Sequence, residues 1–597
     1  MKKTFFIYSI VLVSLTSCQK FLSREPENQV SSANFMTKEN DLVLYANGFI
    51  QRHMPSEETL VWGDEISDIT AVRNTTTFLI GDNWSADQQG GWTGGSDGTW
   101  SKLRNINYFL NNLSKAKANV SDAVYKHYEG VGRFWRAYFY YDMVQTFGDV
   151  PWYDQALEVS DYDLLNKGRD SREFVMQKVL EDLNFAVDNC STESKYVKSS
   201  TMINKWVALA LKSRICLFEG TYRKYHTELN LQSSANTYLQ EAVNASENLM
   251  QQGPYSLVNS SANVGTQYRA LFNSEAFNEK EIIFGIRFQK DIRMHSITWK
   301  LFSGSFGNNW SLSQDFVNQY LNLDGSRFTD VPDYTTKTYQ QNFANRDNRL
   351  KQTVIGPDYQ RRIGGTIKKD PPNFAVTSTG YQLIKWGIDD DAYVGVANSY
   401  NSISMFRFAE ILLNYAEAKA ELGQFGISEW DKSIRLLRER AGVNGNAPAT
   451  YDPYLANYYL NQTTDKWILE IRRERSIELI HEDLRYDDLM RWKLGKLLEH
   501  TWKGIYIAQK NTPYDLNNDG VMDVAVVDIL PPAASRVPGV VYLVVGTSYR
   551  LSNGTSGNIE YGFSQNRLWL DKKYLRPVPN SAIQVNPNLK PQNPGWE

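Results

Sequence analysis

Residues 406–423 read FRFAEILLNYAEAKAELG and carry a sustained helical pattern. Apolar side chains recur at spacings of three and four residues, which places them along one face of an α-helix. Gly423 stands directly after the last of them, where helices commonly end in a left-handed glycine. The pattern predicts a packed amphipathic helix whose buried stripe is Phe408, Ile411, Leu412, Tyr415, Ala418 and Leu422.

The same spacing recurs on both sides of this segment, with short links between neighbouring helices. Paired amphipathic helices of this kind are typical of tetratricopeptide-like helix-turn-helix repeats. We therefore expect a mainly α fold of such repeats, with long loop insertions and a few short strands. The further helices expected are 123–146, 171–189, 201–219, 235–251 and 428–440.

Long irregular segments interrupt the helices. Structureless loops of such length are uncommon unless they are functional or contain short strands, so function is expected there. Residues 18–597 are predicted to form a single domain, with its helical part mainly in 35–255 and 403–502. The loop insertions are mainly 62–100, 254–402 and 503–575.

The N-terminus reads as a secretory signal. Lys2 and Lys3 precede an apolar run, residues 5–15, that is too short to span a bilayer as a helix. Small residues then lead to Cys18, as in the lipobox of bacterial lipoproteins, where the cysteine is acylated after cleavage. The prediction is a signal peptide over 1–17 and a lipid anchor on Cys18, although a secreted protein with a chance cysteine there is the alternative.

Charge and cysteine usage exclude several classes of protein. Loss of Lys2 and Lys3 changes the formal charge from −3 to −5, and no basic block suggests nucleic-acid binding. No later segment is apolar over the roughly 18 residues that a transmembrane helix needs. Cys190 and Cys216 lie far apart along consecutive predicted helices, so two unpaired thiols are expected.

Four segments resemble the SusD/RagB family of outer-membrane glycan-binding lipoproteins. One is the arginine-aromatic helix that runs into a Phe-Gly-Asp-x-Pro turn, and another is the helix quoted above. The third is a Glu-Arg helix followed by an Arg-Tyr-x-Asp-Leu-x-Arg-Trp run, and the fourth is the C-terminal Asn-Pro-Gly-Trp ending. In this order they identify the chain as a member of that family: residues 134–152, 406–423, 468–492 and 575–596.

The resemblance implies a role at the cell surface. A lipid-anchored protein on the exterior face of the outer membrane would capture an oligosaccharide or polysaccharide and deliver it to a SusC-like TonB-dependent transporter. It implies no enzymatic activity and no required cofactor. A surface glycoside hydrolase, and a structural lid or adhesive subunit that binds no glycan, are the alternatives.

A sugar ring needs an aromatic plane for its C–H face and short polar groups for its hydroxyls. The first long loop offers Trp84 and Trp92 as planes, with Asp64, Asp68 and Arg73 as polar groups, and the second offers Trp299 and Trp310. The family's glycan contacts come largely from these two regions, so all seven are predicted glycan-binding residues. The alternatives are packed hydrophobic anchors for the tryptophans and solvated loop charges for the others.

One segment has the ligand spacing of a calcium-binding loop. Oxygen ligands would come from Asp515, Asn517, Asp519, the carbonyl of Val521, and Asp523. The usual bidentate Glu is replaced by Val526, so the structural calcium ion predicted here would need a ligand from elsewhere. An Asn/Asp/Gly-rich turn between strands is the alternative.

Support for an enzyme is weak. The six histidines are dispersed, and the motifs of zinc proteases, α/β-hydrolases and nucleotide-binding loops are missing. The charged run at 472–475 with Glu478 is interpreted as a solvated face or as a structural set of ion pairs in the helical body.

Overall fold

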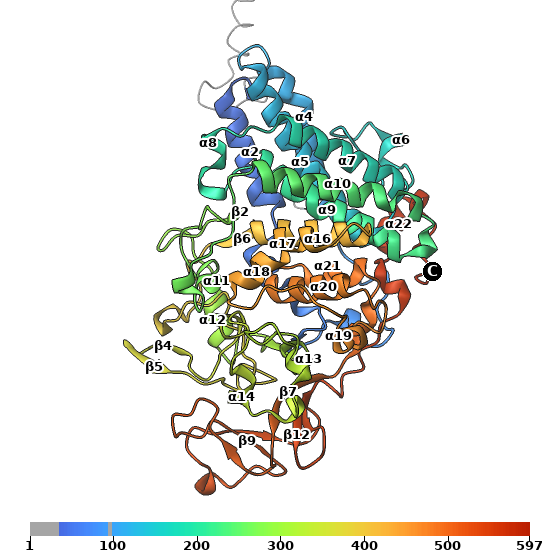
Figure 1. Ribbon diagram of the computed structural model, residues 1–597. Coiled ribbons are helices and arrows are strands. Elements are labelled where there is room, and N and C mark those ends of the chain that lie inside the picture. The colour runs from blue at the N-terminus through green and yellow to red at the C-terminus, as the bar shows by residue number, and fades with distance from the viewer. Residues whose placement is uncertain (1–34, 94–97) are drawn as a thin grey trace, which may run out of the picture.

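The computed structural model describes residues 35–93 and 98–597 (Figure 1). Cys18 and the predicted signal peptide lie outside the described residues. Within these ranges, no helix combines the length and the apolar character needed to cross a membrane.

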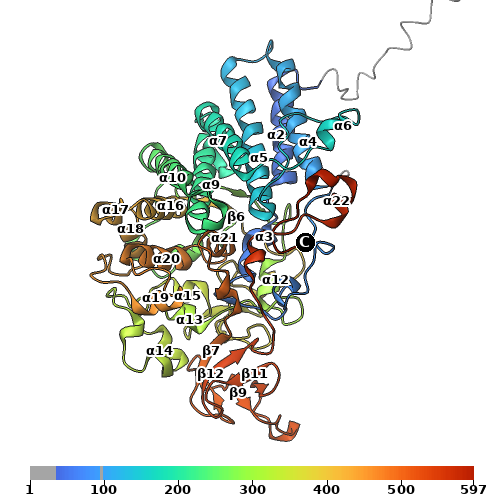
Figure 2. The same cartoon turned by 90° about the vertical axis from the view of Figure 1, so that its right-hand side faces the viewer.

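Pairs of long helices form one end of the molecule. Helix α5 packs against α7, and α9 packs against α10, while α2 and α4 lie against α5. Figures 1 and 2 show these helices stacked successively, as expected for tetratricopeptide-like repeats. Their bounds are α2 Glu39–His53, α4 Thr99–Asn112, α5 Asp122–Phe147, α7 Arg172–Asn189, α9 Lys205–Tyr225 and α10 Gln232–Gln252.

Helices from late in the sequence continue the same stack. Helix α16 (Phe408–Glu421) packs against α9 and α10 on one side and against α20 (Lys466–Glu478) on the other. Helix α21 (Arg485–Arg491) contacts α9. The two helical parts predicted from the sequence therefore share one body, in which the intervening chain is an insertion.

Most predicted helices are confirmed with small shifts of their ends. Gly423, which follows the C-cap Leu422 of α16, has φ +70°, as expected for a glycine that ends a helix. Helix α9 begins later than predicted because the Asn204 side chain caps it, accepting hydrogen bonds from the backbone N–H groups of Trp206 and Val207. The helix predicted at 428–440 was wrong as a single element: it is broken at Ser433, whose hydroxyl donates to the carbonyl of Glu429, into α17 (Ile427–Lys432) and α18 (Ile434–Arg440).

Short strands lie mainly in or beside the long insertions. Two three-stranded sheets, in the orders β10-β9-β8 and β11-β12-β7, form the end of the molecule opposite the N-terminal helices (Figure 2). Strand β2 pairs with β6, and β4 forms an exposed hairpin with β5. The bounds are β2 Ile282–Ile286, β4 Gln360–Ile363, β5 Thr366–Lys369, β6 Ile403–Arg407, β7 Trp502–Ile507, β8 Pro513–Tyr514, β9 Val524–Val527, β10 Val541–Val544, β11 Tyr549–Leu551 and β12 Gly557–Tyr561.

Short helices occupy the remaining loops and ends. Each spans four to six residues, so their position depends on the core against which they pack. They are α3 Glu57–Trp62, α6 Tyr162–Leu165, α8 Ser194–Val197, α11 Gln267–Ala270, α12 Ile297–Phe302, α13 Gln314–Val317, α14 Tyr339–Phe343, α15 Leu350–Thr353, α19 Pro453–Tyr458 and α22 Asn580–Val585.

One small antiparallel pair brings the first two insertions together. Strand β1 (Thr70–Ala71) pairs with β3 (Ser311–Leu312), with Thr70 opposite Leu312. All four residues are buried, so the pairing is fixed by the core beneath it. Loops that are more than 200 residues apart in the sequence therefore meet at one surface.

The C-terminal segment returns to the first insertion. The backbone N–H of Leu568 donates to the carbonyl of Leu79 at 2.8 Å, and the N–H of Arg576 donates to the carbonyl of Thr146 at 2.7 Å. The Trp596 ring stacks on Phe78 with a centroid separation of 6.4 Å. The first insertion is thus held between the end of α5 and the last residues of the chain.

The charged run of α20 is buried, so its interpretation as a solvated face was wrong and that as a structural ion-pair set is confirmed. The Glu478 carboxylate forms ion pairs with Arg349 Nη1 at 2.8 Å and with Arg407 Nη1 at 2.5 Å. It also forms an ion pair with Arg440. Burial alone would raise the pKa of Glu478, but the three guanidinium groups hold it well below its ordinary value. This Glu478 cluster joins α20 to β6, α18 and the residue before α15.

Asp487 differs from Glu478 because it forms no ion pair with any described residue. It accepts a hydrogen bond from the Gln145 amide at 2.9 Å, and burial raises its pKa to about 6. Because this folded-state pKa lies above the unfolded value of about 3.9, the stabilising contribution is complete below that value and is lost as the pH rises through about 6.

The variant Asp487→Asn should therefore be more stable than the wild type above this range. We expect a gain of about 1–3 kcal/mol in the free energy of unfolding at about pH 7.5 and almost none at about pH 4, measured by urea denaturation. Asp163→Asn, at an exposed carboxylate, is the control and should leave the free energy of unfolding unchanged at both pH values. Equal stability of Asp487→Asn and wild type at both pH values would contradict the prediction.

Cys190 and Cys216 are free, as predicted, and both are buried. Cys190 caps the end of α7, and Cys216 lies within α9. Burial raises the pKa of the Cys216 thiol to about 12, so the reactive thiolate is disfavoured at neutral pH.

Candidate functional site

An open hollow of about 680 Å³ lies where the first two insertions meet. It is bounded by α3, by the residues around β1, and by the loop after α12, and we call it the aromatic hollow. It is lined by Glu58, Thr59, Trp62, Gly63, Glu65, Ile66, Arg73, Asn74, Lys300, Phe306, Gly307, Asn308 and Trp310.

Arg73 fastens the two insertions together at this surface. Its guanidinium donates to the carbonyls of Gly304 at 3.2 Å and Gly307 at 2.7 Å. Its backbone N–H donates to the carbonyl of Asn308 at 2.7 Å. Arg73 lines the hollow, and these bonds show that it also fixes the shape of the opposite wall; its role in glycan binding stays a prediction.

Two aromatic pairs lie at the hollow, one stacked and one tilted. Trp62 and Trp310 stack with centroids 3.8 Å apart and planes 8° from parallel, and the Trp310 indole N–H donates to Glu65 at 3.1 Å. Trp310 is only 7% exposed, so the open plane predicted for it is wrong; Trp62 covers its face. In the second pair, Phe306 lies 4.0 Å from Trp299 and is 59% exposed, so Phe306 supplies the open plane.

Charged side chains at the rim are already paired. Lys300 lies 2.5 Å from Glu58 across the hollow, from α12 to α3. Glu65 accepts hydrogen bonds from Asn308 at 3.2 Å as well as from Trp310. The rim therefore presents mutually oriented donors and acceptors beside an aromatic plane, the combination that sugar hydroxyls and a C–H face require.

Asp64 and Asp68 do not reach this surface, which corrects the prediction for both. Asp64 is fully buried and accepts backbone N–H groups of His481 at 2.6 Å and Arg485 at 2.9 Å, and burial raises its pKa to about 6. Asp68 pairs with the Arg485 guanidinium at 2.8 and 2.7 Å and accepts the hydroxyl of Tyr458 at 2.7 Å. Both carboxylates position α21 and the chain before it.

Trp84 and Trp92 lie away from the aromatic hollow, so the four predicted tryptophans do not form one site. Half-buried Trp84 packs edge-on against Phe78, with Arg576 near its ring. Half-buried Trp92 packs against Trp100 and Phe147 beside a second, more apolar hollow of about 620 Å³ between α4 and α22. Both positions match the alternative of packed hydrophobic anchors.

The predicted calcium loop is stabilised by hydrogen bonds from its own backbone N–H groups to its aspartates. Asp515 accepts the backbone N–H of Gly520 at 2.8 Å, Asp519 accepts that of Val521 at 2.8 Å, and Asp523 accepts that of Leu516 at 2.7 Å. In the part of the chain that the structure describes, no three His, Cys, Asp or Glu side chains are placed to hold a metal ion. The geometry therefore gives the calcium prediction no support and matches the alternative of a turn between strands β8 and β9.

Comparisons with known proteins agree with this architecture. A family profile described as the SusD family matches residues 259–596, more than half of the chain, and one described as "Starch-binding associating with outer membrane" matches residues 20–217. SusD-like protein P25 of Formosa agariphila is 24% identical over 536 residues, which are 83% of this chain and 90% of that protein.

Solved structures show the same fold. A SusD-like protein of Bacteroides fragilis has a TM-score of 0.67 at 20% identity and covers 96% of this chain and 100% of its own. A SusD-like carbohydrate-binding protein of the same species has a TM-score of 0.67 at 20% identity and covers 93% and 100%. The fold is that of the SusD-like proteins, with helical repeats and inserted loops. The chain belongs to the SusD family.

Proposed function

We propose that this protein binds a glycan at the aromatic hollow, without catalysis, and delivers it to a SusC-like TonB-dependent transporter. In this proposal it is anchored by lipid on Cys18 to the outer membrane and faces the cell exterior. The observation that carries the proposal is the exposed Phe306 plane, backed by Trp299 and flanked by the ordered polar rim of Arg73, Glu65 and Lys300. The family description of starch binding and outer-membrane association supports it.

The hollow suits an extended chain better than a small enclosed ligand. It is open, and its lining combines the exposed Phe306 ring with charged and amide side chains. Stacking on a sugar face tolerates different sugars, whereas the rim hydrogen bonds select among hydroxyl arrangements. An acid–base pair is not required for capture, so the paired state of the rim charges is compatible with binding alone.

Changing Phe306 to Ala should weaken glycan binding strongly without harming the fold, because the ring is exposed. A glycan array probed with residues 19–597 identifies the ligand, and calorimetry then measures its affinity. We expect a loss of about ten-fold or more, since an aromatic contact with a ligand is commonly worth about 1.4 kcal/mol or more.

Phe174→Ala is the matched control, because Phe174 is an exposed phenylalanine on the distant helix α7. It should bind as the wild type does. If Phe306→Ala also retains full affinity, the hollow is not the glycan site. New reducing ends released from the bound polysaccharide would point instead to a hydrolase, and co-purification with a transporter barrel without any glycan binding would point to a structural subunit.

A further inference from the structure

The apolar hollow beside Trp92 takes no part in the proposed function, and we call it the α4–α22 groove. Its volume is about 620 Å³. Its walls come from the first half of α4, the chain after α5, the end of α6 and helix α22, and Figure 2 shows α4, α6 and α22 on one side of the molecule. The side chains that line it include Trp92, Trp100, Tyr153, Leu157, Leu165 and Val585.

The apolar side chains of the groove are open to an occupant. Val585 of α22 is 81% exposed, and Leu165 of α6 is 42% exposed. The half-buried side chains beside them are Trp92, Trp100, Tyr153 and Leu157. Exposed apolar groups that gather in a concave surface commonly mark a place where another stretch of chain binds.

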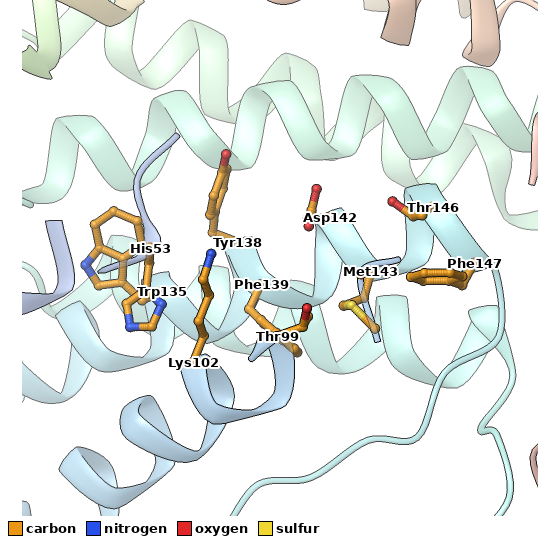
Figure 3. Close-up of a pocket in the computed structure, with 11 residues that line it drawn as sticks. His53, Thr99, Lys102, Trp135, Tyr138, Phe139, Asp142, Met143, Thr146 and Phe147 are labelled. Atoms are coloured by element: carbon orange, nitrogen blue, oxygen red, sulfur yellow. The ribbon is translucent and has the colours of Figure 1, made fainter. Parts of the chain in front are cut away.

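The smaller pocket along α5 has a different lining (Figure 3). Its volume is about 130 Å³, and apolar residues such as Trp135 and Met143 are buried there, so they offer no surface to an occupant. Its exposed side chains include two charged ones, Lys102 of α4 and Asp142 of α5. Helix α4 therefore turns a lysine toward α5 and the aromatic ring of Trp100 toward the groove.

The described chain begins beside the same helix α4. The Phe35 ring lies 6.1 Å from the Tyr45 ring, measured between centroids, and the Tyr45 hydroxyl accepts a hydrogen bond from the Asn105 amide at 2.8 Å. Asn105 is the neighbour of Arg104, which lines the groove. The residues before Phe35 therefore join the body next to α4, a helix about 10–12 Å across.

Residues 19–34 are long enough to reach the groove. An extended chain covers about 3.3 Å per residue, so these sixteen residues can span roughly 50 Å, several times the width of α4. Phe21 and Leu22 are the only adjacent pair of large apolar residues in this segment. Because they are tethered to the body, their effective concentration at the groove is about millimolar, so even weak apolar contacts suffice to hold them.

The charges of the segment and of the groove are complementary. Lys20 and Arg24 flank the apolar pair. Residues 151–165, which border the groove, carry no basic side chain but four carboxylates, Asp154, Glu158, Asp161 and Asp163. Glu158 pairs with Arg104, whereas the other three form no ion pair with a described residue. Complementary charges of this kind orient a bound segment.

We infer that residues 19–34 fold back on the body and place Phe21 and Leu22 in the α4–α22 groove. The two side chains cover the exposed Leu165 and Val585, and the flanking bases meet the acidic segment beside them. This intramolecular docking does not depend on glycan binding. If the proposed lipid anchor is present, docking also holds this face of the protein toward the membrane, and that consequence alone rests on the proposed function.

Limited digestion with trypsin tests the docking in the mature chain without lipid, residues 19–597. Cleavage after Arg24 requires the segment to leave the groove. Mass spectrometry should show this cleavage to be about ten-fold slower in the wild type than in the Phe21→Ser, Leu22→Ser variant. A ten-fold difference corresponds to about 1.4 kcal/mol in favour of the docked state. Equal rates would overturn the inference.

Changes in the groove should have the same effect as changes in the segment. Leu165→Asp with Val585→Asp should speed the cleavage about ten-fold, and both positions are exposed, so the fold should tolerate the change. Ile529→Asp with Val537→Asp is the matched control, because these residues are 82% and 39% exposed in the loop between β9 and β10. It should be cleaved as slowly as the wild type, and equal acceleration by both double variants would overturn the inference.

Engineered disulfides locate the segment on the body. Leu22→Cys is combined in turn with Leu165→Cys and with Val585→Cys, because a disulfide forms only where the two Cα atoms approach to within about 7 Å. The native cysteines described by the structure are buried and do not compete. At least one pair should close within a single chain under mild oxidation, whereas Leu22→Cys with Val537→Cys should not.

The remaining outcomes of this experiment contradict the inference. A bond between two chains would assign the groove to a second copy of the protein, and the absence of any bond would leave the groove to another partner. Neither experiment uses a glycan, so an array without glycan hits would contradict the proposed function alone. The two failures are therefore distinguishable.

Discussion

Replacing Glu478 with Ala should lower the free energy of unfolding by about 3–5 kcal/mol, because it leaves buried charges without their partner. Arg349, Arg407 and Arg440 are each 1% exposed or less, and all three bind this carboxylate. Their remaining acceptors, which include Glu281 and Glu474, would face an excess of positive charge. Urea or thermal denaturation of the purified protein measures the loss.

An exposed pair supplies the control for this prediction. Glu158 binds Arg104 at 3.0 Å, but both side chains are half exposed or more. Such pairs contribute about 0–1 kcal/mol, so Glu158→Ala should leave the midpoint almost unchanged. Equal effects of Glu158→Ala and Glu478→Ala would show that the Glu478 cluster contributes no more than a surface ion pair.

The acid stability of the protein should also depend on Glu478. Its folded-state pKa is lowered, so its stabilising contribution is present above the unfolded value of about 4.3 and is lost as the pH falls through the folded value. The gap in stability between wild type and Glu478→Gln should therefore close as the pH is lowered below about 4.

Replacing Asp68 with Ala should destabilise the protein by about 3–5 kcal/mol and leave the glycan affinity of the folded fraction unchanged. This carboxylate holds Arg485 through two hydrogen bonds of 2.8 and 2.7 Å, and it also holds Tyr458. Its removal leaves a guanidinium buried at the start of α21. Denaturation measures the stability, and calorimetry on protein shown to be folded measures the affinity.

The two measurements distinguish a structural Asp68 from a ligand-binding one. Asn74→Ala is a useful comparison, because Asn74 lines the aromatic hollow and is exposed, so it should affect affinity more than stability. A stable Asp68→Ala variant with weakened glycan binding would restore the prediction made for this residue from the sequence.

The helical body was predictable because its signal is local. The stripe of α16 and the glycine after it appear at the expected positions, since periodicity and capping both act within one element. The break at Ser433 was not predictable, because it depends on a serine hydroxyl that bonds back to Glu429 within a packed turn. The buried state of Glu478 was also not decided by its own segment, since its partners come from three distant ones.

The site was predictable only by region. Both insertions do meet, and Arg73, Trp299 and Trp310 lie at or beside their junction. The sequence did not show which ring is exposed. Trp310 is covered by Trp62 from α3, and the exposed ring is Phe306. Glycines at 304 and 307 flank Phe306 and were a usable signal of a projecting turn.

The return of the chain's end to its beginning has a consequence for biosynthesis. Trp596 and Leu568 complete the packing around Phe78 and Leu79, so these early residues must wait for almost the whole polypeptide to be made. Domains usually fold as units while the ribosome extends the chain, and this packing cannot form until Trp596 has been translated. A stop codon introduced just before Leu568 should therefore yield a protease-sensitive product, in which Phe78 and Leu79 lack these partners.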